Sequence, residues 1–212
     1  MNPYSVTRDF ESALCEYTGA RYAVAVNSCT AALMLAVQWV REQYDVKMMT
    51  LYIEIPRRTY VSVPCAILNA GAVPDFRDEE WRGAYELRPT LKLDGTECNI
   101  WDCARRFTSG MYVKGQFQCV SFSASKILGA EQGGAILHDN READAWFRRM
   151  RFDGRTEGVA TVDDHFDLIG HHCLMIPSVA ATLLVRLYHL PKHNEDLPEV
   201  EYPDLSKHTA FQ

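Results

Sequence analysis

In the stretch Cys119-Val-Ser-Phe-Ser-Ala-Ser-Lys126-Ile-Leu-Gly-Ala-Glu-Gln-Gly-Gly134-Ala-Ile-Leu, apolar and small residues surround a single lysine. Two apolar runs separated by glycines predict a strand, a turn that holds Lys126, and a second strand. Because Ala124, Ile127 and Leu128 flank the lysine, we expect partial desolvation of its amine and a lowered pKa, which makes it a Schiff-base nucleophile. An ordinary lysine at the edge of a loop is the simpler interpretation of the stretch taken alone.

The composition is that of an ordinary globular protein. Its 212 residues are 47% hydrophobic, with a formal net charge of -6 and a pI near 5.6. Lys and Arg are scattered, which argues against nucleic acid as an electrostatic partner. Seven cysteines without a CxxC pair indicate buried thiols in a reducing compartment. Without a leader or a membrane-spanning apolar run, we expect a cytoplasmic protein with no membrane contact.

Strand and helix signals alternate along most of the chain. We expect helices at 6–16, 31–44, 61–69, 141–152 and 178–189, and strands at 22–26, 49–55, 72–76 and 99–101, besides the two strands around Lys126. The alternation predicts the α/β class, with a mostly parallel (mixed) sheet covered by helices on both faces.

Two parts of the chain are less regular. For residues 78–97 we expect short strands and a hairpin turn at Asp94-Gly95. Residues 191–212 contain three prolines and several acidic residues, which predicts an extended tail. We therefore divide the chain into an α/β domain at 1–190 and a tail at 191–212.

Four segments, taken in order, carry a resemblance to a known family. They are residues 10–33, which include Tyr-Ala-Val-Ala-Val-Asn-Ser-Cys-Thr, residues 56–74, Trp101-Asp-Cys-Ala104, and residues 121–134. In these segments the chain resembles the DegT/StrS family of pyridoxal-phosphate (PLP) sugar aminotransferases, which have the fold-type-I aspartate aminotransferase architecture. The resemblance implies a PLP-binding large domain.

The turn Ser28-Cys29-Thr30 precedes a long predicted helix. A phosphate dianion binds where backbone N–H groups and a helix dipole meet, and such a turn offers both. A plain helix cap explains the turn equally well. The resemblance implies that this turn holds the cofactor phosphate together with the hydroxyl of Ser121, which alone is an ordinary strand serine.

Asp102 ends a predicted apolar strand, where a charge is costly without a cationic partner. In PLP enzymes that partner is the pyridinium nitrogen, whose proton makes the ring an electron sink. A cap for the residues from Cys103 onward is the alternative. The resemblance places Tyr60 against one face of the ring and Ala104 against the other, although a tyrosine in such a segment is more often part of a core.

The mechanism implied by the resemblance begins with an internal aldimine between Lys126 and PLP. A substrate amine displaces the lysine, whose free amine then acts as general base and acid. Asp102 stabilises the negative charge that the ring takes up.

Two positions depart from the family pattern. Arg105 stands where the family usually has Gln or His near the ring hydroxyl, and an arginine there would lower the pKa of the phenolate or bind a substrate carboxylate or phosphate. An exposed arginine at a helix start is the alternative. His172 stands at the family's asparagine that reaches the partner subunit's phosphate, which implies a homodimer with shared sites. His165, His171 and His172 lack the spacing of a metal site, so we expect no metal.

The chain is short for this family. Residues 78–97 replace a longer stretch, and nothing after Gln212 corresponds to the small C-terminal domain that walls the substrate pocket. An open site suits a bulky substrate, such as an amine or amino acid on a nucleotide-sugar, a polymer or a nucleic acid. Trimmed members of large families are frequent in viral genomes, so a phage protein in the host cytoplasm is a further expectation.

Three functions follow from these expectations. The first is transfer of an amino group. The second is decarboxylation or a lyase reaction on an amino-acid moiety, with Arg105 reshaping the pocket. The third is an inactive, cofactor-binding scaffold, which the retention of Lys126, Asp102 and Ser121 argues against.

Overall fold

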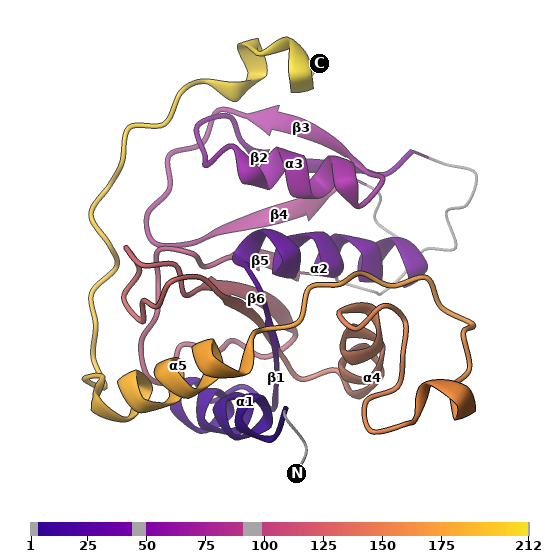
Figure 1. Ribbon diagram of the computed structural model, residues 1–212. Coiled ribbons are helices and arrows are strands. Elements are labelled where there is room, and N and C mark those ends of the chain that lie inside the picture. The colour runs from indigo at the N-terminus through magenta and orange to yellow at the C-terminus, as the bar shows by residue number, and fades with distance from the viewer. Residues whose placement is uncertain (1–3, 44–49, 91–98, 212) are drawn as a thin grey trace.

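The computed structural model describes residues 4–43, 50–90 and 99–211 (Figure 1). They form a seven-stranded sheet in the order β1-β7-β6-β5-β4-β2-β3. The strands are β1 (Tyr22–Val26), β2 (Tyr52–Pro56), β3 (Val73–Arg77), β4 (Tyr85–Pro89), β5 (Asn99–Asp102), β6 (Gln116–Ser121) and β7 (Gly134–His138). The helices are α1 (Ser5–Thr18), α2 (Cys29–Gln43), α3 (Ser62–Asn69), α4 (Arg141–Met150) and α5 (Pro177–His189), and short 3-10 turns are η1 (Thr161–Asp163), η2 (Leu205–Lys207) and η3 (Thr209–Phe211). The predicted Asp94-Gly95 turn lies outside the described residues.

The sheet is mixed, as predicted. β2 pairs with β3 and β5 with β6 in parallel, whereas the other neighbouring pairs are antiparallel. Five strands therefore share one direction, and β4 and β7 run against them. The reversal of β4 follows from its short connection to β3, residues 78–84, because a parallel crossover needs a dozen or more residues.

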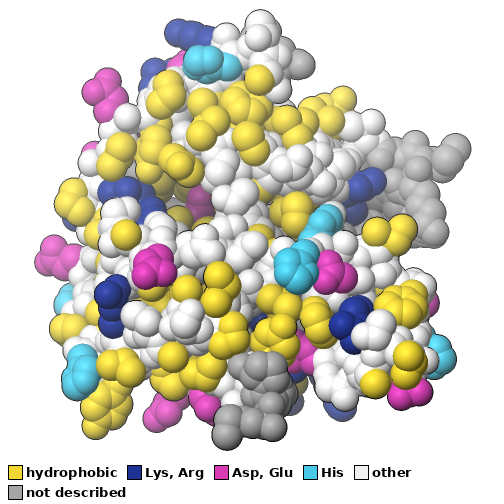
Figure 2. Space-filling view, viewed as in Figure 1, with side chains coloured by type: hydrophobic (Ala, Val, Ile, Leu, Met, Phe, Trp, Pro, Cys, Tyr) yellow, Lys and Arg dark blue, Asp and Glu magenta, His cyan; other side chains and the backbone are white. Residues whose placement is uncertain are grey.

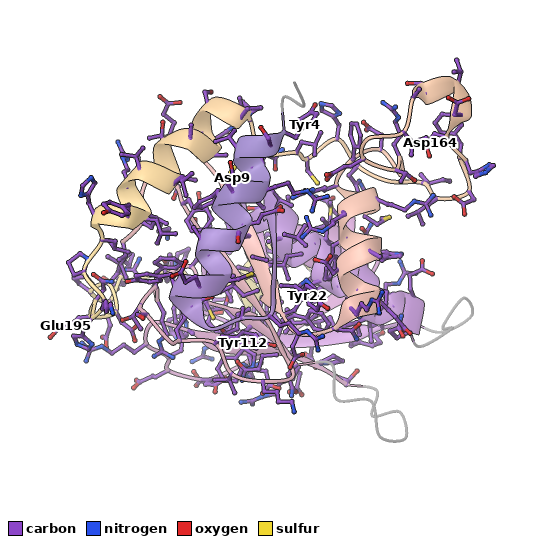
Figure 3. The ribbon with its side chains drawn as sticks, turned by 90° about the horizontal axis from the view of Figure 1, so that it is seen from below. Tyr4, Asp9, Tyr22, Tyr112, Asp164 and Glu195 are labelled. Atoms are coloured by element: carbon purple, nitrogen blue, oxygen red, sulfur yellow. The ribbon has the colours of Figure 1, made fainter. Side chains whose placement is uncertain are left out.

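Helices cover both faces of the sheet, which confirms the predicted layers. Val24 and Val26 of β1 face one core with residues of α2, α3 and α4, while Ala23 and Ala25 face a second core with residues of α1 and α5. Seen from below, α1 and α5 lie side by side (Figure 3). The helix α2 is apolar on most sides because it packs against the sheet and against two other helices.

Local signals set the ends of several helices. Gly19 adopts a positive φ of 82° and closes α1, where the sequence predicts a stop. The side chain of Asn140 accepts hydrogen bonds from the N–H groups of Glu142 and Ala143 at 2.9 and 3.0 Å and so begins α4. Pro177 stands in the first turn of α5, as expected. No helix in the described ranges is both long and apolar enough to cross a bilayer.

The residues after α5 run along the left of Figure 1, from α5 to the edge formed by β2 and β3. Between Leu190 and Asp204 the chain has no helix or named strand. It nevertheless contacts the domain along its length. Asp196 pairs with Arg106, and the side chain of Leu205 is buried.

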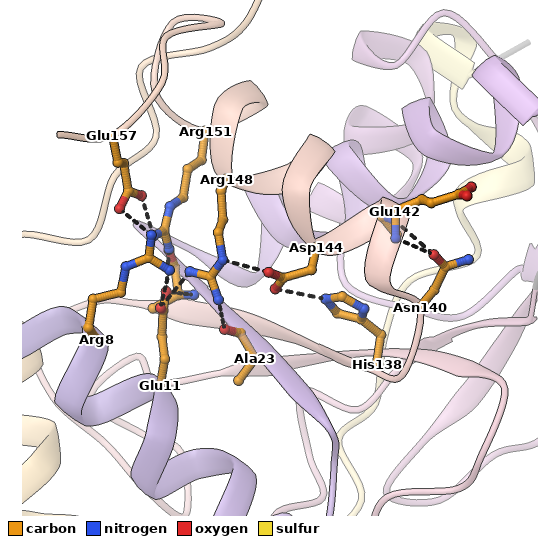
Figure 4. A network of polar contacts seen from close by, with 12 residues as sticks. Arg8, Glu11, Ala23, His138, Asn140, Glu142, Asp144, Arg148, Arg151 and Glu157 are labelled. Carbon is orange, nitrogen blue, oxygen red and sulfur yellow. Dashed lines mark hydrogen bonds and ion pairs between the residues drawn. The ribbon is translucent and has the colours of Figure 1, made fainter. Parts of the chain in front are cut away.

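A buried network of charges joins α1, β1 and α4 (Figure 4). Glu11 of α1 accepts hydrogen bonds from Arg148 and Arg151 and from the N–H group of Ala25 in β1. Arg151 also pairs with Glu157 at 2.7 Å. Burial alone would raise the pKa of Glu11, but the two arginines hold it below its ordinary value. The network thus fixes α1 and α4 to the same edge strand.

Replacing Glu11 with Gln tests this network. We expect a loss of about 3 to 5 kcal/mol in the free energy of unfolding at pH 7, because two arginines lose their buried partner. Urea unfolding measures the loss, and the exposed Glu16→Gln change on the same helix is the control.

The pH dependence gives a second check on Glu11. Its lowered pKa means that its contribution is present above the unfolded-state value near 4.5 and is lost as the pH falls through the folded-state pKa. The difference between wild type and Glu11→Gln should therefore shrink below about pH 4.5. A constant difference down to pH 3 would contradict the assignment.

Candidate functional site

The candidate site lies where β1, β5 and β6 end, at the carboxyl ends of three strands that share one direction. A cavity of about 420 Å³ opens there. Nine of the ten predicted site residues line it: Ser28, Cys29, Thr30, Tyr60, Asp102, Ala104, Arg105, Ser121 and Lys126. Ligand sites of α/β proteins favour this edge of the sheet.

Asp102 is 6% exposed at the end of β5. One carboxylate oxygen accepts the N–H group of Ala104 at 2.8 Å, and the other accepts the hydroxyl of Tyr85 at 3.1 Å. Burial raises the pKa of Asp102, while these two donors and the charge of Lys126 oppose the rise. Among the described residues no cationic side chain forms an ion pair with it, so the carboxylate has neutral donors but no counter-ion in contact.

Tyr85 connects Asp102 to Thr59, which also lines the cavity. Its hydroxyl lies 2.6 Å from that of Thr59, and both side chains are buried. In the antiparallel pairing of β4 with β5, Tyr85 stands directly opposite Asp102. The strand pairing therefore positions the donor that holds the carboxylate.

Lys126 is half-buried in the turn between β6 and β7, and its N–H group donates to the carbonyl of Ser123 at 2.9 Å. Burial lowers the pKa of its amine, Asp102 opposes this effect, and Arg105 adds to it. The direction agrees with the prediction from the flanking apolar residues. No hydrogen bond or ion pair within the described chain engages the amine, which remains available for chemistry.

The turn before α2 packs tightly against the beginning of β7. The hydroxyl of Ser28 accepts the N–H group of Ala31 at 3.1 Å, so Ser28 does act as a helix cap. A side chain on Gly134 would place its Cβ 2.4 Å from the nitrogen of Cys29. Glycine is required there because two backbone segments approach closely. The first turn of α2 thereby borders the cavity with N–H groups that lack intrahelical acceptors.

Hydroxyl groups gather on the wall formed by the end of β6. Ser121, Ser123 and Ser125 all border the cavity, and the hydroxyls of Ser121 and Ser123 lie 3.4 Å apart. Together with Thr30, which also lines the cavity, they offer donors suited to a phosphate. The alternating serines of the lysine stretch carried this signal, but only Ser121 was predicted.

Tyr60 is 59% exposed, so it is not a core residue. Its ring lies 6.5 Å from that of Tyr202 in the tail. Arg105 is half-buried, and its guanidinium donates to the carbonyl of Pro198. Tyr60 is therefore not part of a core, and Arg105 is not an exposed arginine at a helix start, which were the simpler interpretations of these residues.

His172 does not line the cavity. Its side chain is 78% exposed, and its Nδ1 lies 2.9 Å from a carboxylate oxygen of Asp153. Its expected contact with a partner subunit's phosphate stays a prediction. Within the described ranges, no three His, Cys, Asp or Glu side chains are grouped to hold a metal ion.

Several lining residues were not predicted. They are Leu33, Thr59, Ser62, Val63, Trp81, Ser123, Ser125, Gln132, Gly133, Val200 and Tyr202. Thr59 and Ser62 neighbour the predicted Tyr60 and could have been found with it. Trp81 and Tyr202 come from segments without a regular pattern, and only the folded structure brings them to the site.

The fold gives the class of the protein. Its seven-stranded mixed sheet covered by helices is the fold of solved structures of PLP-dependent aminotransferases. A model of the DegT/DnrJ/EryC1/StrS aminotransferase family matches residues 1–83 and 109–200, and the chain belongs to this family.

Solved structures share the fold. A putative PLP-dependent aminotransferase from Bacillus cereus has a TM-score of 0.67 at 20% identity, with 88% of this chain and 59% of that chain covered. The putative sugar aminotransferase Spr1654 from Streptococcus pneumoniae in its PMP form has a TM-score of 0.68 at 18% identity, with 88% of this chain and 59% of that chain covered. Helicobacter pylori PseC has a TM-score of 0.66 at 19% identity, with 88% of this chain and 58% of that chain covered. The chain thus spans about three fifths of these proteins, and no curated protein sequence matches it.

The charges around Lys126 predict how its amine titrates. Asp102→Asn removes a negative charge and should lower the pKa of Lys126 further, whereas Arg105→Gln removes a positive charge and should raise it. The rate of Lys126 acetylation as a function of pH, followed by peptide mass spectrometry, measures both shifts. The exposed Lys114 is the internal control. Shifts of the same sign in both variants would contradict the electrostatic account.

Proposed function

We propose that this cavity binds PLP and that the chain transfers an amino group to or from a substrate, with Lys126 as the covalent anchor of the cofactor. One observation carries the proposal. Asp102 is a nearly fully buried carboxylate with two neutral donors and, in the described chain, no ion-pair partner. Such a group is costly unless a cation completes it, and a protonated ring nitrogen has the required charge.

The other residues of the cavity fit the same group. The first turn of α2 and the hydroxyls of Ser121, Ser123 and Thr30 suit a phosphate. Tyr60 offers an exposed aromatic face, and Ala104 offers a small apolar surface. Cys29 is buried and its thiol pKa is raised by burial, so it is a neutral part of the wall. Bound PLP would supply an electron sink for charge that develops on a substrate carbon.

Each proposed catalytic side chain has a defined task. Lys126 has a lowered pKa, so its amine can be free of a proton, bind a carbonyl group, and later accept and return a proton at Nζ. Asp102 would hold the protonated ring nitrogen of bound PLP. Tyr85 keeps Asp102 in place through its hydroxyl. The lining side chains of Leu33 and Val63 add apolar surface to the cavity.

We propose a sugar-linked or similarly bulky substrate. Two of the structural neighbours support this class: Spr1654 is described as a putative sugar aminotransferase, and PseC as an aminotransferase of pseudoaminic acid biosynthesis. The decarboxylase alternative relied on a pocket reshaped by Arg105 and by the missing domain, and Arg105 was also a candidate ligand for a substrate carboxylate or phosphate. Its guanidinium instead donates to a backbone carbonyl of the tail, which favours amino-group transfer.

We also propose a homodimer with shared sites. Hydrophobic side chains gather on the face shown in Figure 2, over the region of β2, β3 and α3. Val61 and Leu68, at the two ends of this region's helix, are 47% and 40% exposed. This surface adjoins Tyr60 and therefore lies beside the cavity. Sedimentation velocity of the wild-type protein measures the assembly.

Lys126→Ala tests the proposed function directly. With wild-type protein and PLP, borohydride should trap the cofactor on the peptide that contains Lys126, and the protein should absorb visible light. The variant should lose the trapped adduct, the protein-linked absorbance and all turnover, whereas Lys114→Ala should retain them. An adduct of equal yield in Lys126→Ala would contradict the assignment of Lys126 as the covalent anchor of PLP.

The reaction type needs a separate measurement. An amino donor given to the loaded wild-type protein should yield its keto product in an amount equal to the cofactor. Release of carbon dioxide without a keto product would instead establish decarboxylation. Neither product from any amine tested, despite a trapped adduct, would favour the scaffold.

A further inference from the structure

A second cavity of about 560 Å³ adjoins the candidate site. The two cavities share four lining residues, which are Trp81, Arg105, Val200 and Tyr202. Val200 and Tyr202 belong to the segment 195–205, which we call the strap. The strap therefore forms part of the wall between the proposed cofactor site and the outer cavity.

One end of the strap is fixed beside Asp102. The N–H group of Leu197 donates to the carbonyl of Arg105 at 2.9 Å, and the side chain of Arg106 makes two hydrogen bonds with Asp196, at 2.9 and 2.7 Å. Gly83, at a positive φ of 69°, leaves the room that Asp196 occupies, since a Cβ there would lie 2.0 Å from its carboxylate. This end of the strap is therefore held by Arg105 and Arg106, which lie close to Asp102 in the sequence.

The other end of the strap is fixed to the loop after β2. The N–H group of Leu205 donates to the carbonyl of Arg57 at 2.9 Å, and Leu205 is 2% exposed. Asp204 lies 3.7 Å from the guanidinium of Arg57. Between the two ends, no backbone hydrogen bond of the described chain holds residues 199–203. The middle of the strap contacts the domain through side chains.

Tyr202 makes that contact. Its ring stacks on Trp81, with centroids 6.0 Å apart and an interplanar angle of 13°, and meets Tyr60 at 6.5 Å. Trp81 packs in turn against Tyr85, with centroids 4.7 Å apart, and Tyr85 donates to Asp102. Tyr202 is therefore the outermost ring of an aromatic series that ends at the buried carboxylate.

We propose that the strap is the substrate-side wall of the active site and that Tyr202 is its specificity-determining residue. It would admit a substrate whose flat ring lies against the aromatic face while its amine or carbonyl end reaches Lys126, because aromatic faces bind planar rings and the apolar faces of sugars. The inference rests on the proposed function for the identity of the reaction, but the wall itself can be tested without cofactor.

The experiment measures which reagents reach Lys126. Wild-type protein, Tyr202→Ala and Tyr202→Phe are each treated with a small amine acylating reagent, the N-hydroxysuccinimide ester of acetate, and with the bulky ester of biotin. Peptide mass spectrometry gives the ratio of bulky to small modification at Lys126. We expect Tyr202→Ala to raise this ratio several-fold, because removal of the ring opens the wall in front of Lys126, and Tyr202→Phe to keep the wild-type ratio.

Three controls keep the result decisive. Tyr188→Ala removes an 86% exposed tyrosine from α5 and should change nothing. The exposed Lys114 should show the same ratio in every variant. Asp196→Asn weakens the fixed end of the strap without altering a lining side chain, and it should also raise the ratio. This variant tests the wall independently if Tyr202→Ala does not fold.

An unchanged ratio at Lys126 in both Tyr202→Ala and Asp196→Asn would overturn the proposal. Failure of the proposed function would show itself differently, as the absence of a PLP adduct on wild-type Lys126. In protein that turns over, Tyr202→Ala should raise the KM of the amino acceptor by a larger factor than it lowers kcat.

Discussion

The burial of the Asp102 carboxylate is the constraint on which the site depends. Removal from water raises its pKa, and the same low-dielectric surroundings lower the pKa of Lys126. Burial thus disfavours the charged form of each group, and the charge of each partly offsets this effect on the other. These properties fit the proposed roles of Lys126 as the covalent anchor of the cofactor and of Asp102 as the partner of its cation.

The reversed strand β4 is what makes this burial tolerable. Because residues 78–84 are too few for a crossover, β4 runs antiparallel to β5 and places Tyr85 opposite Asp102. The hydroxyl of Tyr85 then reaches the carboxylate, and Thr59 completes its hydrogen bonding. The short connection at residues 78–84 therefore places a hydrogen-bond donor, the hydroxyl of Tyr85, at the site.

Sequence patterns predicted those structural elements that are determined by residues adjacent in the chain. The turn at Lys126, the strand ending at Asp102 and the helix after Ser28 were all identified because glycines, caps and apolar runs act over a few residues. The direction of β4, the roles of Tyr85 and Trp81, and the docking of the tail were not. They arise from pairings between segments far apart in sequence, for which composition carries no signal. The acidic tail illustrates the point, since Asp196 and Asp204 find arginines in the fold.

Arg105 connects the strap to the chemistry of Lys126. Its charge lowers the pKa of the lysine, while its guanidinium donates to the carbonyl of Pro198 in the strap. Displacement of the strap would free that guanidinium and change the field at the amine. If Tyr202 selects the substrate as proposed, the position of the strap and the protonation of Lys126 are coupled through Arg105.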